Sequence, residues 1–139
     1  MSNTILEVNL GSDDDYHFDL IPDGTELEVT IKACYEGINK EDQKTLRPVM
    51  VSVDDPDGTQ DIGAFPIVIP DASQATDKKA FAKTRQRFLA WAECFGIDYS
   101  MGLNVEALKG LKGRVIVSIT DDPQQGRVNQ VKQYVVGQK

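Results

Sequence analysis

The feature that most constrains the fold is a run of eleven residues in which apolar and polar side chains alternate. The run is ELEVTIKACYE, residues 26–36, and its apolar set is Leu27, Val29, Ile31, Ala33 and Tyr35. Because successive side chains of a strand point to opposite faces, this period of two predicts a half-buried strand. The apolar set is expected on a single face of it.

Four further segments are predicted as strands. LRPVMVSV (46–53) places Val49, Val51 and Val53 on one face, and DDPDG (54–58) has the composition of a turn. IGAFPIVIP (62–70) reads as a third strand, although Pro66 lacks an N–H and indicates an edge, a bend or an early end. RVIVSIT (114–120) and RVNQVKQYVV (127–136) then form a closing hairpin around the turn DDPQQG.

A helix is predicted between the third and fourth strands, in TDKKAFAKTRQRFLAWAECFG (76–96). At 100° per residue Phe81, Phe88 and Phe95 fall on one face. Asp77 is expected as the N-cap and Gly96 as the residue that ends the helix. The segment NVEALKGLKG (104–113) predicts a short additional turn of helix with Asn104 as its cap.

The order of these elements predicts a fold class. Three strands, a helix and a closing hairpin match the mainly β OB-fold, a five-stranded Greek-key barrel with its helix between strands 3 and 4. The missing crossover helices exclude a doubly wound α/β fold. We expect one OB-fold domain over residues 25–136, preceded by an acidic N-terminal arm or short strand over residues 1–24.

The charge is unevenly spread. The chain of 139 residues has a net charge of −7, but residues 1–61 hold fifteen acids and four bases, whereas residues 62–139 hold seven acids and eleven bases. An acidic total opposes nonspecific adhesion to nucleic acid, but binding depends on the local potential. The distribution therefore permits a basic face.

Signatures of catalysis and of cofactor or metal binding are missing from the sequence. It contains no G-x-x-x-x-G-K-[ST] loop and no G-x-S-x-G motif, His17 is the only histidine, and Cys34 and Cys94 lie far apart. No apolar run approaches the roughly 20 residues of a membrane-spanning helix. We expect a non-enzymatic protein without cofactor, metal or membrane association, located in the cytoplasm.

Candidate binding residues follow from the predicted barrel, since an OB-fold binds oligonucleotides across strands 2 and 3 and the adjoining loops. Cations can track phosphates there while aromatic rings stack on bases. The candidates are Lys32, Tyr35, Lys40, Lys44, Arg47, Phe65, Arg127, Lys132 and Tyr134. The cations of the helix face opposite the phenylalanines, Lys79, Lys83 and Arg87, are secondary candidates.

Several phrases resemble phage-encoded single-stranded DNA-binding proteins of the OB-fold type. They are IPDGTELEVTIKACYEG, TRQRFLAWAECFGI, EALKGLKGRVIVSI and NQVKQYV, within residues 20–136. In that family a Pro-x-Gly step opens a strand, as at Pro22 and Gly24. A helix ending in an aromatic residue and glycine, as at Phe95 and Gly96, precedes a Leu-x-Gly-Lys/Arg step into strand four, as at Leu111.

The resemblance implies sequence-tolerant binding of single-stranded DNA, with RNA left open, in phage replication, recombination or repair in the cytoplasm of a bacterial host. A homo-oligomer and replication or recombination proteins are the further partners it suggests. Members of the family often carry an acidic C-terminal tail, whereas here the acidic segment is N-terminal. The alternative is a phage structural or assembly protein, an oligomeric β-barrel without nucleic-acid affinity.

Overall fold

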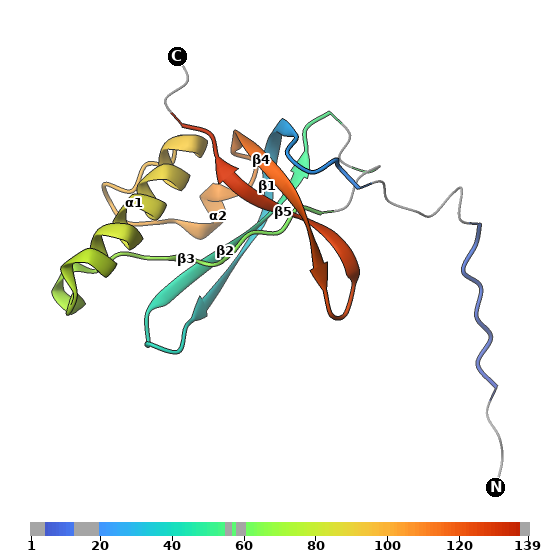
Figure 1. The fold of residues 1–139 in the computed structure, drawn as a ribbon, viewed down its shortest axis with the longest axis horizontal. Helices are drawn as coiled ribbons and strands as arrows, with labels where there is room; N and C mark the ends of the chain where they lie inside the picture. The colour runs from blue at the N-terminus through green and yellow to red at the C-terminus, as the bar shows by residue number, and fades with distance from the viewer. Residues whose placement is uncertain (1–4, 13–19, 55–56, 58–60, 137–139) are drawn as a thin grey trace, which may run out of the picture.

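The computed structural model describes residues 5–12, 20–54, 57 and 61–136 (Figure 1). The triple aspartate 13–15, His17 and most of the turn 54–58 lie outside these residues. The elements in chain order are β1 (Glu26–Ile38), β2 (Lys44–Ser52), β3 (Ile67–Val68), the 3₁₀ turn η1 (Ala72–Gln74), α1 (Lys78–Phe95), α2 (Val105–Leu108), β4 (Lys112–Asp122) and β5 (Gly126–Tyr134). The predicted order of three strands, a helix and a closing hairpin is confirmed.

The five strands form one open antiparallel sheet in the order β3-β2-β1-β4-β5. The central strand, β1, is long enough to serve two partners: its residues 26–30 pair with β4 and its residues 29–38 pair with β2. The protein is therefore mainly β, as predicted, with one long helix.

The third strand is much shorter than predicted. β3 holds only two residues, because Pro66 immediately before it has no N–H to donate to a ladder. Upstream of Pro66 the chain still touches the sheet at isolated bridges, where Ile62 pairs with Met50 of β2 and Gly63 pairs in parallel with Gln130 of β5. The predicted run 62–70 is thus a series of contacts rather than one strand.

A bulge in β1 changes which side chains face the core. The register with β2 shifts between Ile31 and Ala33, so that one extra residue is inserted into β1. Before the bulge Val29 and Ile31 are buried, but after it Cys34 packs against the core and Tyr35 is exposed. The expectation that Tyr35 shares the face of Ile31 is wrong, because an inserted residue reverses the alternation.

The strand β2 also presents its valines away from the core cluster. Leu46 and Met50 belong to that cluster. Val49 and Val51 alternate with them along the strand and do not belong to it. We call the face of β1 and β2 turned away from the core the outer face; its side chains are Ala33, Tyr35, Arg47, Val49 and Val51. Val49 and Val51 do share a face, but it is the outer one.

The helix α1 closes one side of the sheet and contacts β3, β4 and β5 (Figure 1). Its buried face holds Phe88, Trp91, Ala92 and Phe95. Phe88 and Phe95 are confirmed as core residues, and Phe81 is half-buried. Trp91 was not part of the predicted face, yet it is completely buried and packs edge-on against Phe88.

Both predicted ends of α1 are confirmed. The carboxylate of Asp77 accepts hydrogen bonds from the backbone N–H groups of Lys79 and Ala80, at 2.9 and 3.3 Å. At the other end Gly96 adopts a left-handed conformation, with φ of 63°, which glycine reaches without steric cost. Local sequence therefore fixes where this helix begins and stops.

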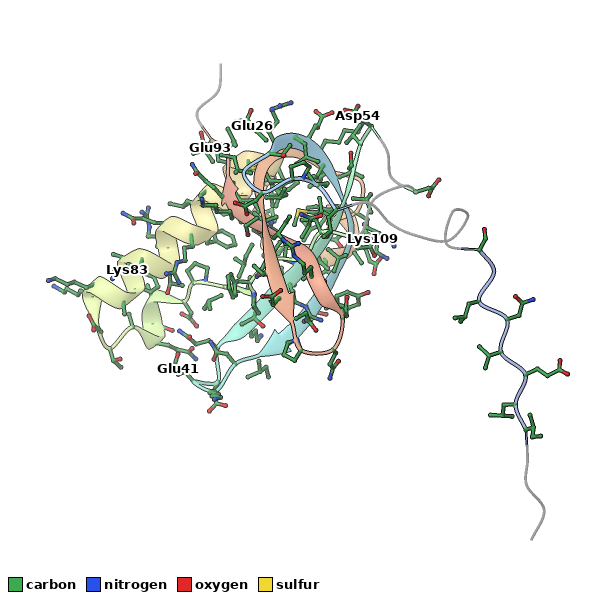
Figure 2. All side chains as sticks on the ribbon, turned by 45° about the vertical axis from the view of Figure 1, so that its right-hand side comes forward. Glu26, Glu41, Asp54, Lys83, Glu93 and Lys109 are labelled. Atoms are coloured by element: carbon green, nitrogen blue, oxygen red, sulfur yellow. The ribbon has the colours of Figure 1, made fainter. Side chains whose placement is uncertain are left out.

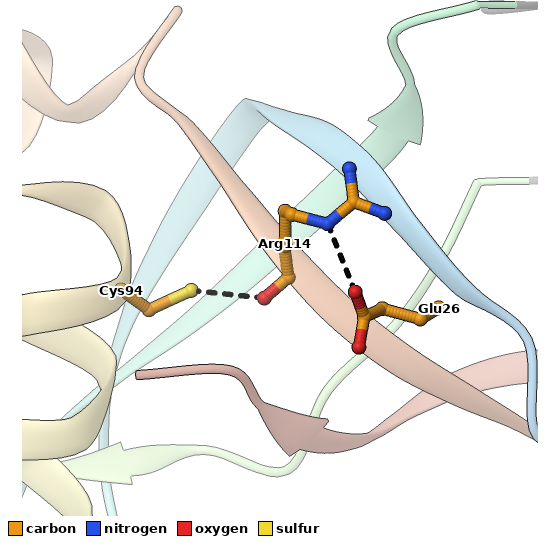
Figure 3. A network of polar contacts seen from close by, with 3 residues as sticks. All are labelled: Glu26, Cys94 and Arg114. Atoms are coloured by element: carbon orange, nitrogen blue, oxygen red, sulfur yellow. Dashed lines mark hydrogen bonds and ion pairs between the residues drawn. The ribbon is translucent and has the colours of Figure 1, made fainter. Parts of the chain in front are cut away.

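The C-terminal end of α1 is tightly attached to β4. A Cβ atom at the buried Gly113 would lie 2.8 Å from the carbonyl oxygen of Cys94, so only glycine allows this approach. The Cys94 thiol donates a hydrogen bond to the carbonyl oxygen of Arg114 at 3.2 Å, and the Arg114 Nε atom donates to Glu26 of β1 at 3.0 Å (Figure 3). This chain of contacts links helix, β4 and β1, and both cysteines are free thiols.

The chain joins the sheet at Ile21. The buried side chain of Asn129 in β5 accepts a hydrogen bond from the Ile21 N–H and donates one to its carbonyl oxygen, both at 2.8 Å. Residues 5–12 form neither helix nor strand, and they extend away from the folded body on the side opposite α1 (Figure 1). Residues 5–12 are called the arm below.

Candidate nucleic-acid interface

The outer face carries an exposed aromatic ring paired with a cation. Tyr35 of β1 and Arg47 of β2 stand opposite each other in the register, and the guanidinium carbon of Arg47 lies 5.9 Å from the centre of the Tyr35 ring. The ring is 55% exposed. An arginine at this distance from an aromatic face is held by a cation–π interaction. The pair leaves ring surface and positive charge accessible to solvent together.

A second exposed ring lies next to this pair in the sheet. Phe65 is 75% exposed, and it falls between two points where the chain is paired with β2, namely Ile62 with Met50 and Ile67 with Leu46. It therefore runs alongside residues 47–49 of β2. The three candidates Tyr35, Arg47 and Phe65 come from three neighbouring segments of the sheet, and an exposed phenylalanine does not contribute to a core.

Lys32 lies at the bulge of β1, but its charge is already matched. Its ammonium donates a hydrogen bond to Asp61 at 2.9 Å, and both side chains remain about half exposed. This hydrogen bond and the negative charge of Asp61 raise the pKa of Lys32 above its ordinary value. A phosphate that approached Lys32 would therefore compete with Asp61, a residue that the sequence did not single out.

Lys40 and Lys44 flank the hairpin between β1 and β2, and both are exposed. The turn between them is well organised, because the Asn39 side chain accepts hydrogen bonds from the N–H groups of Glu41 and Gln43, each at 3.0 Å. Asp42 takes the left-handed backbone conformation, with φ of 61°. The hairpin thus presents its two lysines on a fixed turn.

Arg127 and Lys132 are exposed on β5. Arg127 stands opposite Asp121 of β4, so a carboxylate lies across from it in the register. Lys132 lies closer to the outer-face candidates. The bridge between Gly63 and Gln130 is parallel, so the two segments run in the same direction, and Phe65 and Lys132 each follow the bridge by two residues. Of the two cations, Lys132 is the better placed to join Phe65.

Tyr134 occupies a position suited to packing. Its ring is half-buried and stands edge-on against Phe95 of α1, with the ring centres 6.1 Å apart. Its hydroxyl is buried without a hydrogen-bond partner among the described residues, and this burial raises the pKa of the phenol. The Tyr134 ring is therefore less accessible to a base than the exposed rings of Tyr35 and Phe65.

The secondary candidates lie on a different side of the protein. Lys79, Lys83 and Arg87 are exposed on α1, and Figure 2 shows Lys83 on the side of the helix that points away from the sheet. The aromatic rings of the same helix are turned toward the core. The structure therefore separates these cations from the outer-face group, and no exposed ring of α1 accompanies them.

Within the described residues no group of three or more histidine, cysteine or acidic side chains is arranged to hold a metal ion. None of the helices described is long and apolar enough to cross a membrane. No protein-family model matches the chain, and no curated protein matches it in sequence.

Proposed function

We propose that this chain is a sequence-tolerant single-stranded DNA-binding protein and not an enzyme. The observation that carries the proposal is the outer-face pair of Tyr35 and Arg47, an exposed ring with a guanidinium 5.9 Å from its centre. Phe65, 75% exposed on the neighbouring segment, extends this surface.

The chemistry of this surface suits unpaired bases. Every base has a π-face, so stacking on Tyr35 and Phe65 would not depend on which base is present, and each stacked base contributes about 1–3 kcal/mol. Arg47 would contact the phosphates between stacked bases, and Lys40, Lys44 and Lys132 would extend the positive path along the strand. Duplex DNA hides its base faces, so it should bind more weakly.

The fold that best serves this function is the OB-fold barrel. Two hydrogen bonds between Gly63, which precedes β3, and the strand β5 support closure of the sheet into a barrel. The Gly63 N–H donates to the Asn129 carbonyl oxygen at 3.2 Å, and the Val131 N–H donates to the Gly63 carbonyl oxygen at 2.8 Å. Closure would place the outer face of β1 and β2 beside β5, and the loop between β4 and β5 near it. The resemblance of the sequence phrases favours a role in phage replication, recombination or repair in the cytoplasm of a bacterial host, with proteins of those processes as partners.

The proposal is tested by fluorescence-anisotropy titration of labelled oligo-dT, mixed-sequence single-stranded DNA, single-stranded RNA and duplex DNA at two salt concentrations. We expect similar affinity for the two single-stranded DNAs, weaker binding of duplex, and a loss of affinity with salt whose slope counts the phosphates neutralised. Absence of binding to every single strand at low salt would overturn the proposal.

The exposed apolar side chains of the arm favour a second candidate, an assembly protein without nucleic-acid affinity. The two are separated by the same titration combined with light scattering, because a defined oligomer with no affinity for any oligonucleotide would support only the second.

A further inference from the structure

The arm has the pattern of a strand that lacks both a partner strand and a core. Leu6, Val8 and Leu10 are 80%, 76% and 82% exposed. In an extended chain these three side chains share one face, and Glu7 and Asn9 share the other. Within the described residues, no backbone hydrogen bond joins residues 5–10 to the folded body. A row of exposed apolar side chains marks an interaction site, whereas single exposed ones are ordinary.

The local structure ends this extended run and leaves it accessible. Gly11 takes a left-handed conformation with φ of 70°, and its N–H donates a hydrogen bond to the Asn9 side chain at 3.1 Å. This turn ends the run at Leu10. The arm extends away from the folded body on the side opposite α1 (Figure 1). A second copy can therefore approach the run without displacing any part of the fold.

The run is self-complementary in one antiparallel register, in which Val8 of one copy lies opposite Val8 of the other. Leu6 then lies opposite Leu10, so the apolar side chains of both copies share one face. On the other face Glu7 lies opposite the uncharged Asn9. A shift by one residue mixes the two faces. A shift by two either sets Glu7 opposite Glu7 or leaves Leu6 without an apolar neighbour, and a parallel pairing in register also brings the two carboxylates together.

We propose that the arms of two copies of this protein pair as antiparallel strands around Val8, and that two such ribbons stack by their apolar faces to join four copies. Each pairing uses the same surface of both copies, so it is closed and two-fold. The second ribbon is needed because a two-stranded ribbon alone is only marginally stable in water. The hollow beside α1 offers the arm no comparable match in charge, since four acids help to line it: Glu41, Asp42, Asp71 and Asp77.

This inference does not depend on nucleic-acid binding, and its test contains no nucleic acid. Sedimentation velocity of the full chain over a range of concentrations should show reversible self-association that reaches four copies. Because each chain carries a net charge of −7, added salt should strengthen the association by screening repulsion between copies. A monomer at all concentrations, or an assembly that stops at two copies, would overturn the proposal.

A charge at the two-fold axis tests the assigned face of the arm. Val8→Asp places two carboxylates opposite each other within the apolar face, so it should weaken self-association at least tenfold. Met101→Asp introduces the same charge at a residue that is 96% exposed on the folded body, and it should associate almost as strongly as the unaltered protein. Thermal unfolding checks that both variants fold. Association that survives Val8→Asp would show that the copies meet through another surface.

Disulfide crosslinking tests the register. When a chain with Glu7→Cys is mixed with a tagged chain with Asn9→Cys and oxidised, the two should link, because opposite residues lie about 4.5–5.5 Å apart between Cα atoms, within reach of a disulfide. Glu7→Cys alone places its two thiols diagonally, about 7–8 Å apart, and should link little. The unaltered protein, whose Cys34 and Cys94 are half-buried free thiols, gives the background. Equally efficient linking by Glu7→Cys alone would contradict the antiparallel register and overturn the proposal.

Discussion

The two basic regions of this protein, the exposed face of α1 and the outer face of β1 and β2, differ in what accompanies their cations. The helix has more cations, with Lys79, Lys83 and Arg87 all exposed, but its aromatic rings point into the core. The outer face has fewer, but Arg47 lies beside the exposed Tyr35 ring. A dense run of cations therefore does not by itself locate a site for single strands.

The difference has a geometric cause. At 3.6 residues per turn, the spacing that gathers the phenylalanines of α1 on one side also gathers the cations on the other. In β1 the bulge places Tyr35 on the outer face, opposite Arg47 of β2. Helical periodicity separates rings from charges, and the interrupted strand periodicity brings them together.

The loss of an exposed ring is expected to have one of the two largest effects on oligo-dT binding. Phe65→Ala should raise the dissociation constant for oligo-dT roughly tenfold, because one stacked base contributes about 1–3 kcal/mol. Tyr99→Ala is the control from the helix side, since Tyr99 is 44% exposed and packs against Phe88. Anisotropy titrations should show little change for that variant, with its stability measured in parallel. A larger effect at Tyr99 than at Phe65 would move the site to the helix.

Charge reversal compares the two regions directly. Arg47→Glu should weaken oligo-dT binding roughly tenfold, equivalent to about 1.4 kcal/mol, because it removes a phosphate contact and introduces repulsion. Lys83→Glu makes the same change in charge on α1 and should weaken binding less than about twofold. Titration of both variants at one salt concentration measures the ratio. The reverse order would show that the outer face is not the binding surface.

Removal of the helix cap tests whether α1 acts as scaffold. Asp77→Ala should lower the free energy of unfolding by about 1 kcal/mol, because two N–H groups lose their acceptor. Oligo-dT affinity at a temperature where the protein is folded should stay unchanged. Asp77→Ser keeps a capping oxygen and should recover most of the stability in a urea titration. A cap variant that loses affinity while folded would assign α1 a direct role in binding.

The smallest expected effect is an increase in the affinity for oligo-dT. Asp61→Asn removes the negative charge that faces Lys32, which should strengthen oligo-dT binding roughly twofold to threefold and steepen its salt dependence. Asp54→Asn removes the same charge from another exposed position of the chain and serves as the control. Equal gains in the two variants would mean that only the total charge matters, and that Lys32 has no part of its own in the interface.

Local periodicity and capping decide much of what the sequence predicts correctly. The helix ends at Asp77 and Gly96 depend on side-chain and backbone preferences of single residues, and the turn DDPQQG depends on Asp122 accepting hydrogen bonds from two following N–H groups. Such interactions span a few residues. They are therefore visible in the sequence, as is the order of strands and helix.

The sequence alone could not predict the bulge, the shortness of β3 or the role of Trp91. The register shift at Ile31 and Ala33 arises from pairing with a strand that begins six residues after β1 ends, and nothing in the run 26–36 marks the inserted residue. Likewise, the Lys32 ion pair with Asp61 joins residues 29 positions apart in the chain. Both depend on contacts between segments that are distant in sequence.

For the proposed site, the sequence determined which residue types are present, and the tertiary structure decided which of them lie together. Tyr35, Arg47, Phe65 and Tyr134 were all candidates from their composition and their predicted strands. Packing against Phe95 half-buries Tyr134, whereas the bulge leaves Tyr35 exposed beside Arg47. The physical reason is that exposure is a property of the assembled sheet: a single residue inserted into one strand reverses the direction of every side chain that follows it.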